Sequence, residues 1–203
     1  MDELVSPELS PGQQNDESRI LHSERRKFLV RGSMFTMGAM AAIMLARPAL
    51  ARQASSAVND DVAILNAALA LEFQAIAAYQ VGAESNLLDK PVLDLAVQFQ
   101  SHHKAHSQVL SISIEKLGGT PESSKTIADY AFPVDQLKSQ ADVLQFAAGL
   151  EKAAASTYLK ALSNFHQKNL IKGAASIMGD ETMHWAILLN ALGQNPVPGP
   201  FIS

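Results

Sequence analysis

MGDETMHWAILL, residues 178–189, has the residue spacing of a helix that carries ionisable side chains on its apolar side. Glu181 and His184 share one helical face with Ile177 and Leu188, and this face is the one expected to be buried. A charge buried without a partner costs several kcal/mol and is rarely tolerated. Either this helix faces water at that point, or groups elsewhere in the protein hold both side chains.

The chain on both sides of this stretch, from Asn59 to Gly193, also has a helical pattern. Asn59 and the two aspartates after it make a favourable helix N-cap, Pro91 favours the start of a second helix, and Gly118 favours its end. β-Branched runs and period-2 alternation are lacking, so the sequence predicts an all-α fold. The four predicted helices cover residues 62–84, 92–117, 140–164 and 168–192.

The connections between these helices differ in length. Short turns join the first helix to the second and the third to the fourth, whereas GGTPESSKTIADYAFPVDQLKS (118–139) joins the second to the third. A connection of about twenty residues in a compact domain needs a structural reason. One long crossover between two antiparallel helical hairpins is the wiring of ferritin-like four-helix bundles, whereas a simple up-and-down bundle has three short loops.

The two predicted hairpins also align with each other. LEFQAIAAY (71–79) matches LEKAAASTY (150–158) with an offset of 79 residues. HHKAH (102–106) matches DETMH (180–184) with an offset of 78 residues, so that His106 aligns with His184. This internal repeat predicts two copies of one helical hairpin, related by an approximate twofold axis.

Ionisable side chains recur at one depth on the apolar faces of all four predicted helices. The first and third helices each carry a glutamate in an Ala-rich stripe, the second carries two histidines, and the fourth carries a glutamate and a histidine. Six side chains are therefore expected to meet near the middle of the bundle: Glu72, His103, His106, Glu151, Glu181 and His184. Three carboxylates and three imidazoles buried together need a cation or shared protons, and a metal ion supplies the opposing charge.

Residues 59–193 resemble the ferritin-like superfamily, and in particular the exported bacterial ferritin-like domain proteins. The resemblance is carried by GDETMHWAIL (179–188), by the two LE…Y helices and by the position of the crossover. It implies a centre with two metal ions, iron first, with manganese or zinc as alternatives. It also implies roles for individual residues: Glu72 and Glu151 as terminal carboxylates, Glu181 as a bridging carboxylate, His106 and His184 as imidazole ligands, and Asp180 as an outer acid that accepts a histidine N–H.

One position departs from the pattern of this family. His103 stands where the family has a second bridging glutamate, and His102 precedes it instead of an acid. The expected ligand set then carries a charge of −3 rather than −4 against two divalent ions. Three outcomes are open: an asymmetric two-metal site, a single metal ion, or a site that prefers Zn²⁺, Mn²⁺ or Cu²⁺ to iron.

Four other residues are interpreted without a role in metal binding. His102 is set aside as a non-ligand, and His166, at the turn between the third and fourth helices, is expected at the surface. Tyr79 and Tyr158 are interpreted as core aromatics whose hydroxyls contact water.

The N-terminal region has the features of an export signal. SERRKFLV (23–30) contains an arginine pair, GSMFTMGAMAAIMLA (32–46) is a short apolar run, and Ala49-Leu50-Ala51 is a peptidase site. Residues 1–51 therefore resemble a cleaved twin-arginine signal peptide, which implies the twin-arginine export machinery as a partner and a periplasmic location. The apolar run is too short for a lasting membrane anchor. Residues 52–58 are interpreted as a linker, and 194–203 as an extended C-terminal tail.

Composition limits the classes of function. The net charge is −4 with no basic stripe, so nucleic acid is not an expected partner, and the absence of cysteine excludes disulfides and thiolate metal sites. The leading prediction is an exported metal-binding protein that oxidises iron or reacts with O₂ or peroxide. The alternative is a metal-free structural or stress-protective bundle, whose polar centre is closed by internal hydrogen bonds. Storage in a hollow shell is disfavoured, because three prolines prevent the extra helix that it requires; a homodimer is compatible with the sequence.

Overall fold

The computed structural model describes residues 37–202, with side chains from residue 53 onwards. The chain divides into two units, residues 1–53 and 54–203, and the second unit contains the bundle. The arginine pair and most of the predicted signal peptide lie outside the described residues.

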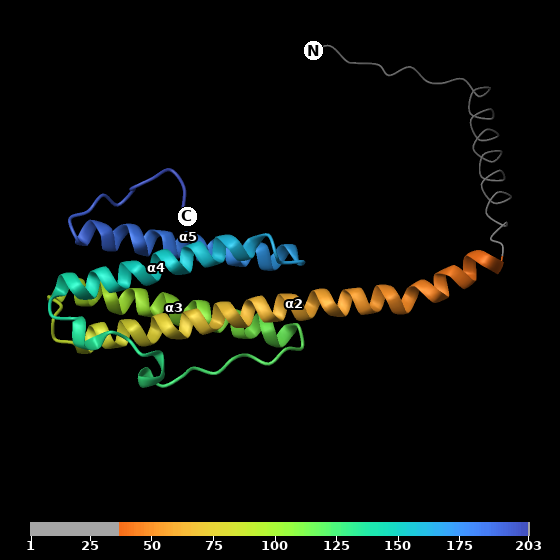
Figure 1. The fold of residues 1–203 in the computed structure, drawn as a ribbon, viewed down its shortest axis with the longest axis horizontal. Helices are drawn as coiled ribbons and strands as arrows, with labels where there is room; N and C mark the ends of the chain where they lie inside the picture. Colours follow the sequence, from red (N-terminus) through yellow and green to blue (C-terminus); the bar gives the residue numbers. More distant parts are fainter. Residues whose placement is uncertain (1–36, 203) are drawn as a thin grey trace, which may run out of the picture. The chain divides into compact units, whose positions relative to one another are not determined.

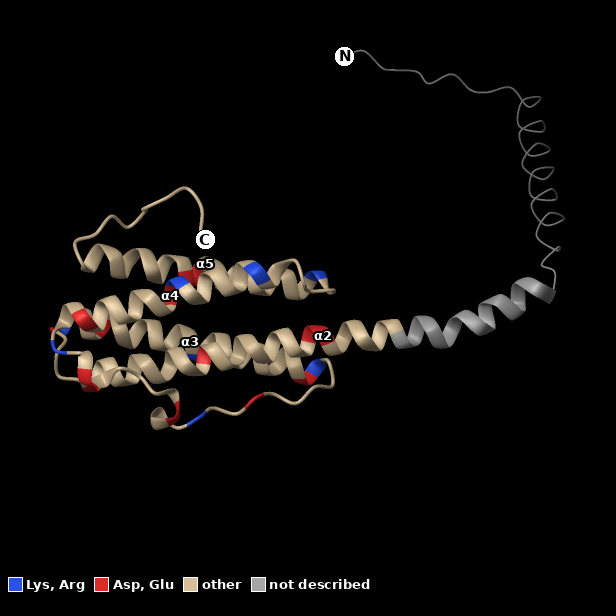
Figure 2. Cartoon of the chain, viewed as in Figure 1, with Lys and Arg blue, Asp and Glu red and all other residues tan. Residues whose placement is uncertain are grey.

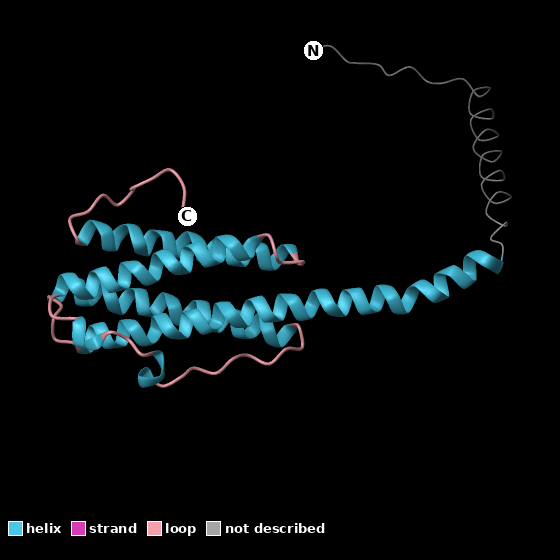
Figure 3. Cartoon of the chain, in the orientation of Figure 1, coloured by secondary structure: helices cyan, strands magenta, loops and turns pink. Residues whose placement is uncertain are grey.

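All regular elements of the described chain are helical, which confirms the predicted all-α class (Figure 3). Long helices are connected in the predicted order, with one crossover between the second and the third, so the predicted four-helix bundle is also confirmed (Figure 1). The elements are α2 (Met37–Glu84), α3 (Lys90–Lys116), α4 (Gln140–Leu162) and α5 (Lys168–Ala191), with two 3₁₀ turns in the crossover, η1 (Ile127–Tyr130) and η2 (Val134–Gln136).

Local capping interactions determine where α3 and α4 begin. The Asp89 side chain accepts the Val92 N–H at 3.1 Å at the start of α3, and Pro91 lies in the first turn. The Ser139 side chain accepts the Asp142 N–H at 3.3 Å at the start of α4. The observed starts of α3 and α4 lie within two residues of the predicted ones. Such starts can be predicted because a cap residue contacts the backbone only a few positions away.

The predicted start of the first helix at Asn59 is wrong. The helix is continuous from Met37 to Glu84, so Asn59 is an interior residue. Residues 53–58 contain neither glycine nor proline, and Ala54 and Ala57 favour the helical conformation, so nothing in this segment ends the helix. Asp61, placed in the predicted cap, is instead fully buried and accepts the backbone N–H of His166 at 2.8 Å.

One segment of the described chain, Gln53–Glu84, is long and apolar enough to cross a membrane, with a mean hydropathy of 1.6. The same segment supplies buried side chains to the bundle, and 44% of its most apolar window is buried inside the protein. Core helices of soluble proteins pass the same test. One such segment is therefore weak evidence of a membrane span.

Two apolar clusters fill the bundle on either side of its middle. The first contains buried side chains of all four helices, including Leu69, Ile114 and Leu170. The second is built around Phe99, Leu144 and Leu188. Lysines are interspersed with Asp and Glu along α3, α4 and α5 (Figure 2). Along each helix, the buried glutamates and histidines lie between the two apolar clusters.

The C-terminal segment after α5 forms no regular element in residues 194–202. Gly193, with φ +70°, ends the helix in the left-handed conformation that glycine adopts without strain. Val197 and Phe201 are strongly exposed, so these two side chains of the tail do not pack into the bundle.

Candidate metal centre

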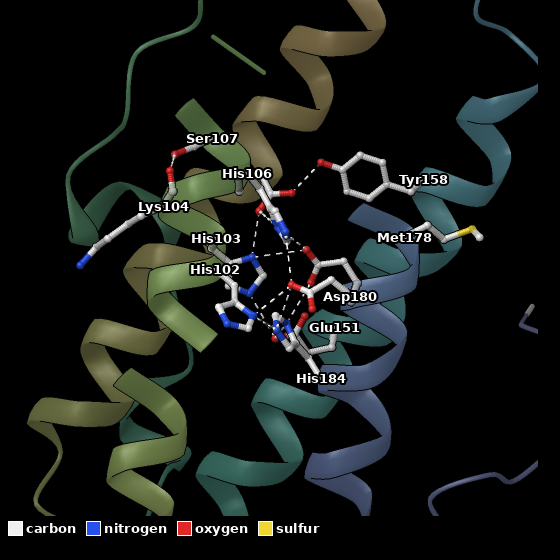
Figure 4. A network of polar contacts seen from close by, with 12 residues as sticks. His102, His103, Lys104, His106, Ser107, Glu151, Tyr158, Met178, Asp180 and His184 are labelled. Atoms are coloured by element: carbon white, nitrogen blue, oxygen red, sulfur yellow. Dashed lines mark hydrogen bonds and ion pairs between the residues drawn. The ribbon is translucent and has the colours of Figure 1, made fainter. Parts of the chain in front are cut away.

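The structure brings all six side chains singled out in the sequence together in two overlapping groups of donor atoms. Figure 4 labels His103, His106, Glu151 and His184 of this set, which converge from α3, α4 and α5. Glu72 comes from α2, His103 and His106 from α3, Glu151 from α4, and Glu181 and His184 from α5. Five of the six side chains are at most 2% exposed, and the His106 side chain is 15% exposed. Every long helix of the bundle contributes at least one ionisable group to this centre.

The helical spacing explains how the centre is assembled. The two polar residues of α3, and likewise the two of α5, are three positions apart, so each pair shares one helical face. On α2, Ala68 and Ala75 flank Glu72 by one turn on either side, and all three are buried. On α4, Ala148 and Ala155 flank Glu151 in the same way. These small side chains leave room for the carboxylates between the helices.

The first group of donor atoms comprises Glu72, His103, His106 and Glu181. His103 Nδ1 lies 2.8 Å from Glu72 Oε2 and 3.6 Å from Glu181 Oε1. His106 Nδ1 lies 3.0 Å from Glu181 Oε1 and 3.5 Å from Glu72 Oε2. Two nitrogens and two oxygens therefore surround one point.

The second group comprises His103, Glu151, Glu181 and His184. Glu151 Oε1 lies 3.2 Å from His103 Nε2 and 3.5 Å from His184 Nδ1. His184 Nδ1 lies 3.4 Å from Glu181 Oε2. The two groups share Glu181, with one oxygen in each, and they share His103, with one ring nitrogen facing each.

Several buried atoms of the centre lack a hydrogen-bond partner in the described structure: His106 Nδ1, His184 Nδ1, Glu151 Oε2 and both oxygens of Glu181. Leaving such atoms unpaired in the interior costs about 1–3 kcal/mol each. They are the atom types that bind transition metals in proteins, and the two nitrogens and both Glu181 oxygens face the two groups. The donor set therefore fits a pair of metal ions.

Two buried tyrosines contact the carboxylates in a reciprocal pattern. The Tyr158 hydroxyl, on α4, donates to Glu72 Oε1 on α2 at 2.6 Å, and the Tyr79 hydroxyl, on α2, donates to Glu151 Oε1 on α4. The expectation that these hydroxyls contact water is wrong, because both side chains are buried. A signal was present in the repeat: each tyrosine follows the glutamate of its own helix by seven residues, or two turns.

Asp180 and His102 lie at the outer edge of the centre. Asp180 Oδ2 lies 3.3 Å from Nε2 of both His106 and His184, and 3.0 Å from His102 Nδ1. His102 Nδ1 is also 2.9 Å from His184 Nε2. The sequence analysis set His102 aside, although the repeat aligns it with Asp180. His166 is half exposed at the α4–α5 turn, as expected.

The carboxylates and imidazoles shift one another's pKa values in opposite directions. Burial alone would raise the pKa values of Glu72 and Glu151, but the neighbouring histidines lower both on balance. Burial alone would lower the pKa of His103, but Glu151 and Glu72 raise it to about 10. Contacts with the same set of glutamates raise the pKa values of His106 and His184 to about 9. Burial raises the pKa of Glu181. Without metal, the imidazoles therefore carry protons that offset the carboxylate charge.

Comparison with known proteins gives a family and a fold. The model of the ferritin-like domain matches residues 60–194. No curated protein matches the chain. Among solved structures, a conserved hypothetical protein from Mycobacterium tuberculosis is 21% identical, with a TM-score of 0.61 over 70% of this chain and 97% of its own. A structure described as ferritin like, diiron-carboxylate proteins, from Bacillus anthracis, is 23% identical, with a TM-score of 0.58 over 67% of this chain and 97% of its own. At these identities the two structures support the fold alone.

Proposed function

The chain belongs to the ferritin-like domain family, and we propose that it is an exported metal-binding protein with two metal ions at the bundle centre. One observation carries the proposal: buried nitrogen and oxygen atoms without hydrogen-bond partners converge on two neighbouring points. Closely packed apolar residues on both sides of the centre would exclude water from the bound ions.

The residues around the centre would each do a definite task. Glu72 and Glu151 would each bind one ion. Tyr158 holds Glu72 Oε1, which leaves Oε2 to face the metal. Tyr79 would orient the Glu151 carboxylate through Oε1, the oxygen that also faces His103. Asp180 would accept the Nε2–H of His106 and of His184, which leaves Nδ1 of both rings free to bind. With iron bound, the pair would supply electrons to O₂ or to a peroxide.

Export is part of the same proposal. Its support is the sequence alone: an arginine pair at 25–26, a short apolar run, and an Ala-x-Ala site at 49–51. The twin-arginine machinery exports folded proteins, so the metal would be loaded in the cytoplasm before the protein reaches the periplasm.

Metal content tests this function. The mature protein, reconstituted aerobically and freed of loosely bound ions, is expected to hold about two transition-metal ions per chain by elemental analysis. Metal should also raise the melting temperature, and Glu151→Ala should abolish that rise, since it removes a carboxylate from the second group. Glu115→Ala, on the exposed side of α3, is the matched control and should keep both properties. Trace metal in the wild-type protein would defeat the proposal.

A metal-free structural role is the alternative, and one observation favours it. His103 forms hydrogen bonds with both Glu72 and Glu151, so a protonated ring would close part of the centre without metal. On this reading, added metal leaves the melting temperature of the wild-type protein unchanged. The measurement that tests the metal centre therefore also separates the two functions.

A further inference from the structure

The geometry points to His103 as a ligand shared by both metal ions, with Nδ1 bound to one ion and Nε2 to the other. This inference rests on the proposed metal centre and goes beyond it, because it names the residue that replaces a bridging carboxylate. His103, which departs from the family pattern, would then bind metal in place of the second bridging glutamate.

The ring of His103 is oriented for this role. It is 1% exposed, and its two nitrogens face carboxylates from different halves of the bundle: Nδ1 is 2.8 Å from Glu72 on α2, and Nε2 is 3.2 Å from Glu151 on α4. The ring is confined by Tyr79 and His184, with both ring centroids 5.4 Å away. No other imidazole of the described centre directs its two nitrogens into both donor groups.

The spacing of the donor atoms fits two small ions. Metal–nitrogen and metal–oxygen bonds of about 2.0–2.1 Å in a tetrahedral site place neighbouring donors about 3.3–3.4 Å apart. Four nitrogen–oxygen pairs of the first group are 2.8 to 3.6 Å apart. Three such pairs of the second group are 3.2 to 3.5 Å apart, and all donor atoms of each group lie within 4.8 Å of one another. Each group would therefore accept an ion with small side-chain shifts.

Charge balance supports the same arrangement. Glu72, Glu151 and Glu181 together carry −3, one charge short of two divalent ions. An imidazole that binds metals through both nitrogens has given up its ring protons to solvent and carries −1, because metal ligands must be deprotonated. The ligand set then carries −4 and neutralises two divalent ions in a site that excludes water.

The shared ring also affects which metal ions the centre would prefer. Each ion would have two imidazole nitrogens and two carboxylate oxygens in a four-coordinate site. Imidazole suits Zn²⁺, Cu²⁺, iron and Ni²⁺, whereas Mn²⁺ prefers carboxylate, carbonyl and water oxygens in a six-coordinate arrangement. Mn²⁺ is therefore expected to bind at least tenfold more weakly than Zn²⁺.

A crystal structure of the Zn²⁺-loaded mature protein, with anomalous scattering at the zinc edge, tests the inference. The expected result is two peaks per chain, each about 2.0–2.1 Å from a different nitrogen of His103. Two peaks with His103 bound to one ion or to neither would overturn the shared ligand but leave the metal centre standing, whereas a single peak would overturn both the shared ligand and the proposed pair of ions. Sub-stoichiometric zinc in solution would instead defeat the metal centre itself.

X-ray absorption of the same zinc-loaded protein gives an independent readout. The wild-type spectrum should require two imidazole nitrogens per zinc, and His103→Glu, which restores a carboxylate, should lower this number to one while zinc content stays at two. His166→Ala, at the exposed α4–α5 turn, is the control and should keep both values. An unchanged imidazole number in His103→Glu would overturn the inference, and if that variant fails to fold, the wild-type crystal decides.

Discussion

Tyr79 and Tyr158 link the halves of the bundle through single hydroxyl groups. The Tyr79 hydroxyl on α2 donates to Glu151 on α4, the Tyr158 hydroxyl on α4 donates to Glu72 on α2, and all four side chains are buried. Burial and the facing glutamate raise the pKa of each tyrosine, so both hydroxyls keep their protons and remain donors over the physiological pH range.

Removal of either hydroxyl should therefore destabilise the metal-free protein. Tyr158→Phe is expected to cost about 1.5–3 kcal/mol of unfolding free energy, the range for a hydrogen bond to a charged group. Tyr79→Phe should cost a similar amount, and urea denaturation measures both. Tyr130→Phe is the matched control, because that hydroxyl contacts only the Lys125 N–H at the exposed crossover; its cost should be small. Equal stability of all three variants would contradict this account.

The sequence predicted the residues of the centre but missed several contacts between them. The six inward-facing groups followed from helical spacing, which is a local property of the sequence. The tyrosine–glutamate contacts could not be predicted in the same way, because they depend on which helix lies opposite and on the side-chain rotamers. His102 was missed for the same reason: its contact with Asp180 joins residues 78 positions apart.

The order and type of the helices were predictable, whereas one boundary was not. The caps of α3 and α4 lie within a few residues of the helix start, so their signals are legible in the sequence. The start of α2 was misplaced because Asp61 has a tertiary partner, the backbone of the α4–α5 turn, that no local pattern reveals. A favourable cap residue does not end a helix whose preceding residues also favour helix.

Asp61 therefore ties α2 to the beginning of α5. The first turn of α5 contains no acidic residue, and the Asp61 carboxylate supplies a buried acceptor just before that helix N-terminus. Asp61→Ala should lower the unfolding free energy by about 1–3 kcal/mol, since it leaves the His166 N–H unpaired. Asp60→Ala, at an exposed neighbouring position, should change it by less than about 0.5 kcal/mol. Chemical denaturation of the two variants side by side checks the difference.

In the bundle as a whole, the stability of the metal-free protein and the binding of metal depend on pH in opposite directions. Three buried imidazoles have pKa values raised to about 9–10, from an ordinary value of 6.5. Between pH 6.5 and about 9–10, these imidazoles hold more protons in the folded metal-free protein than in the unfolded chain, so the free energy of unfolding falls as pH rises. The contribution of the imidazoles is complete below about pH 6.5 and is lost as pH passes through 9–10. Metal binding reverses this dependence, because it requires those imidazoles to be deprotonated.

The pH dependence of unfolding tests this picture of the metal-free protein. Lysines and exposed tyrosines also titrate above pH 9, so the informative quantity is the difference in unfolding free energy between wild type and His103→Gln. Glutamine cannot take up the proton that Glu72 and Glu151 stabilise on the ring, so wild type should be the more stable at pH 6, and the difference should shrink steadily toward pH 10. Denaturation at pH 6, 8 and 10 in the presence of a chelator measures it, with His166→Ala expected to parallel wild type. A difference that stays constant or grows with pH would show that His103 is neutral in the metal-free centre.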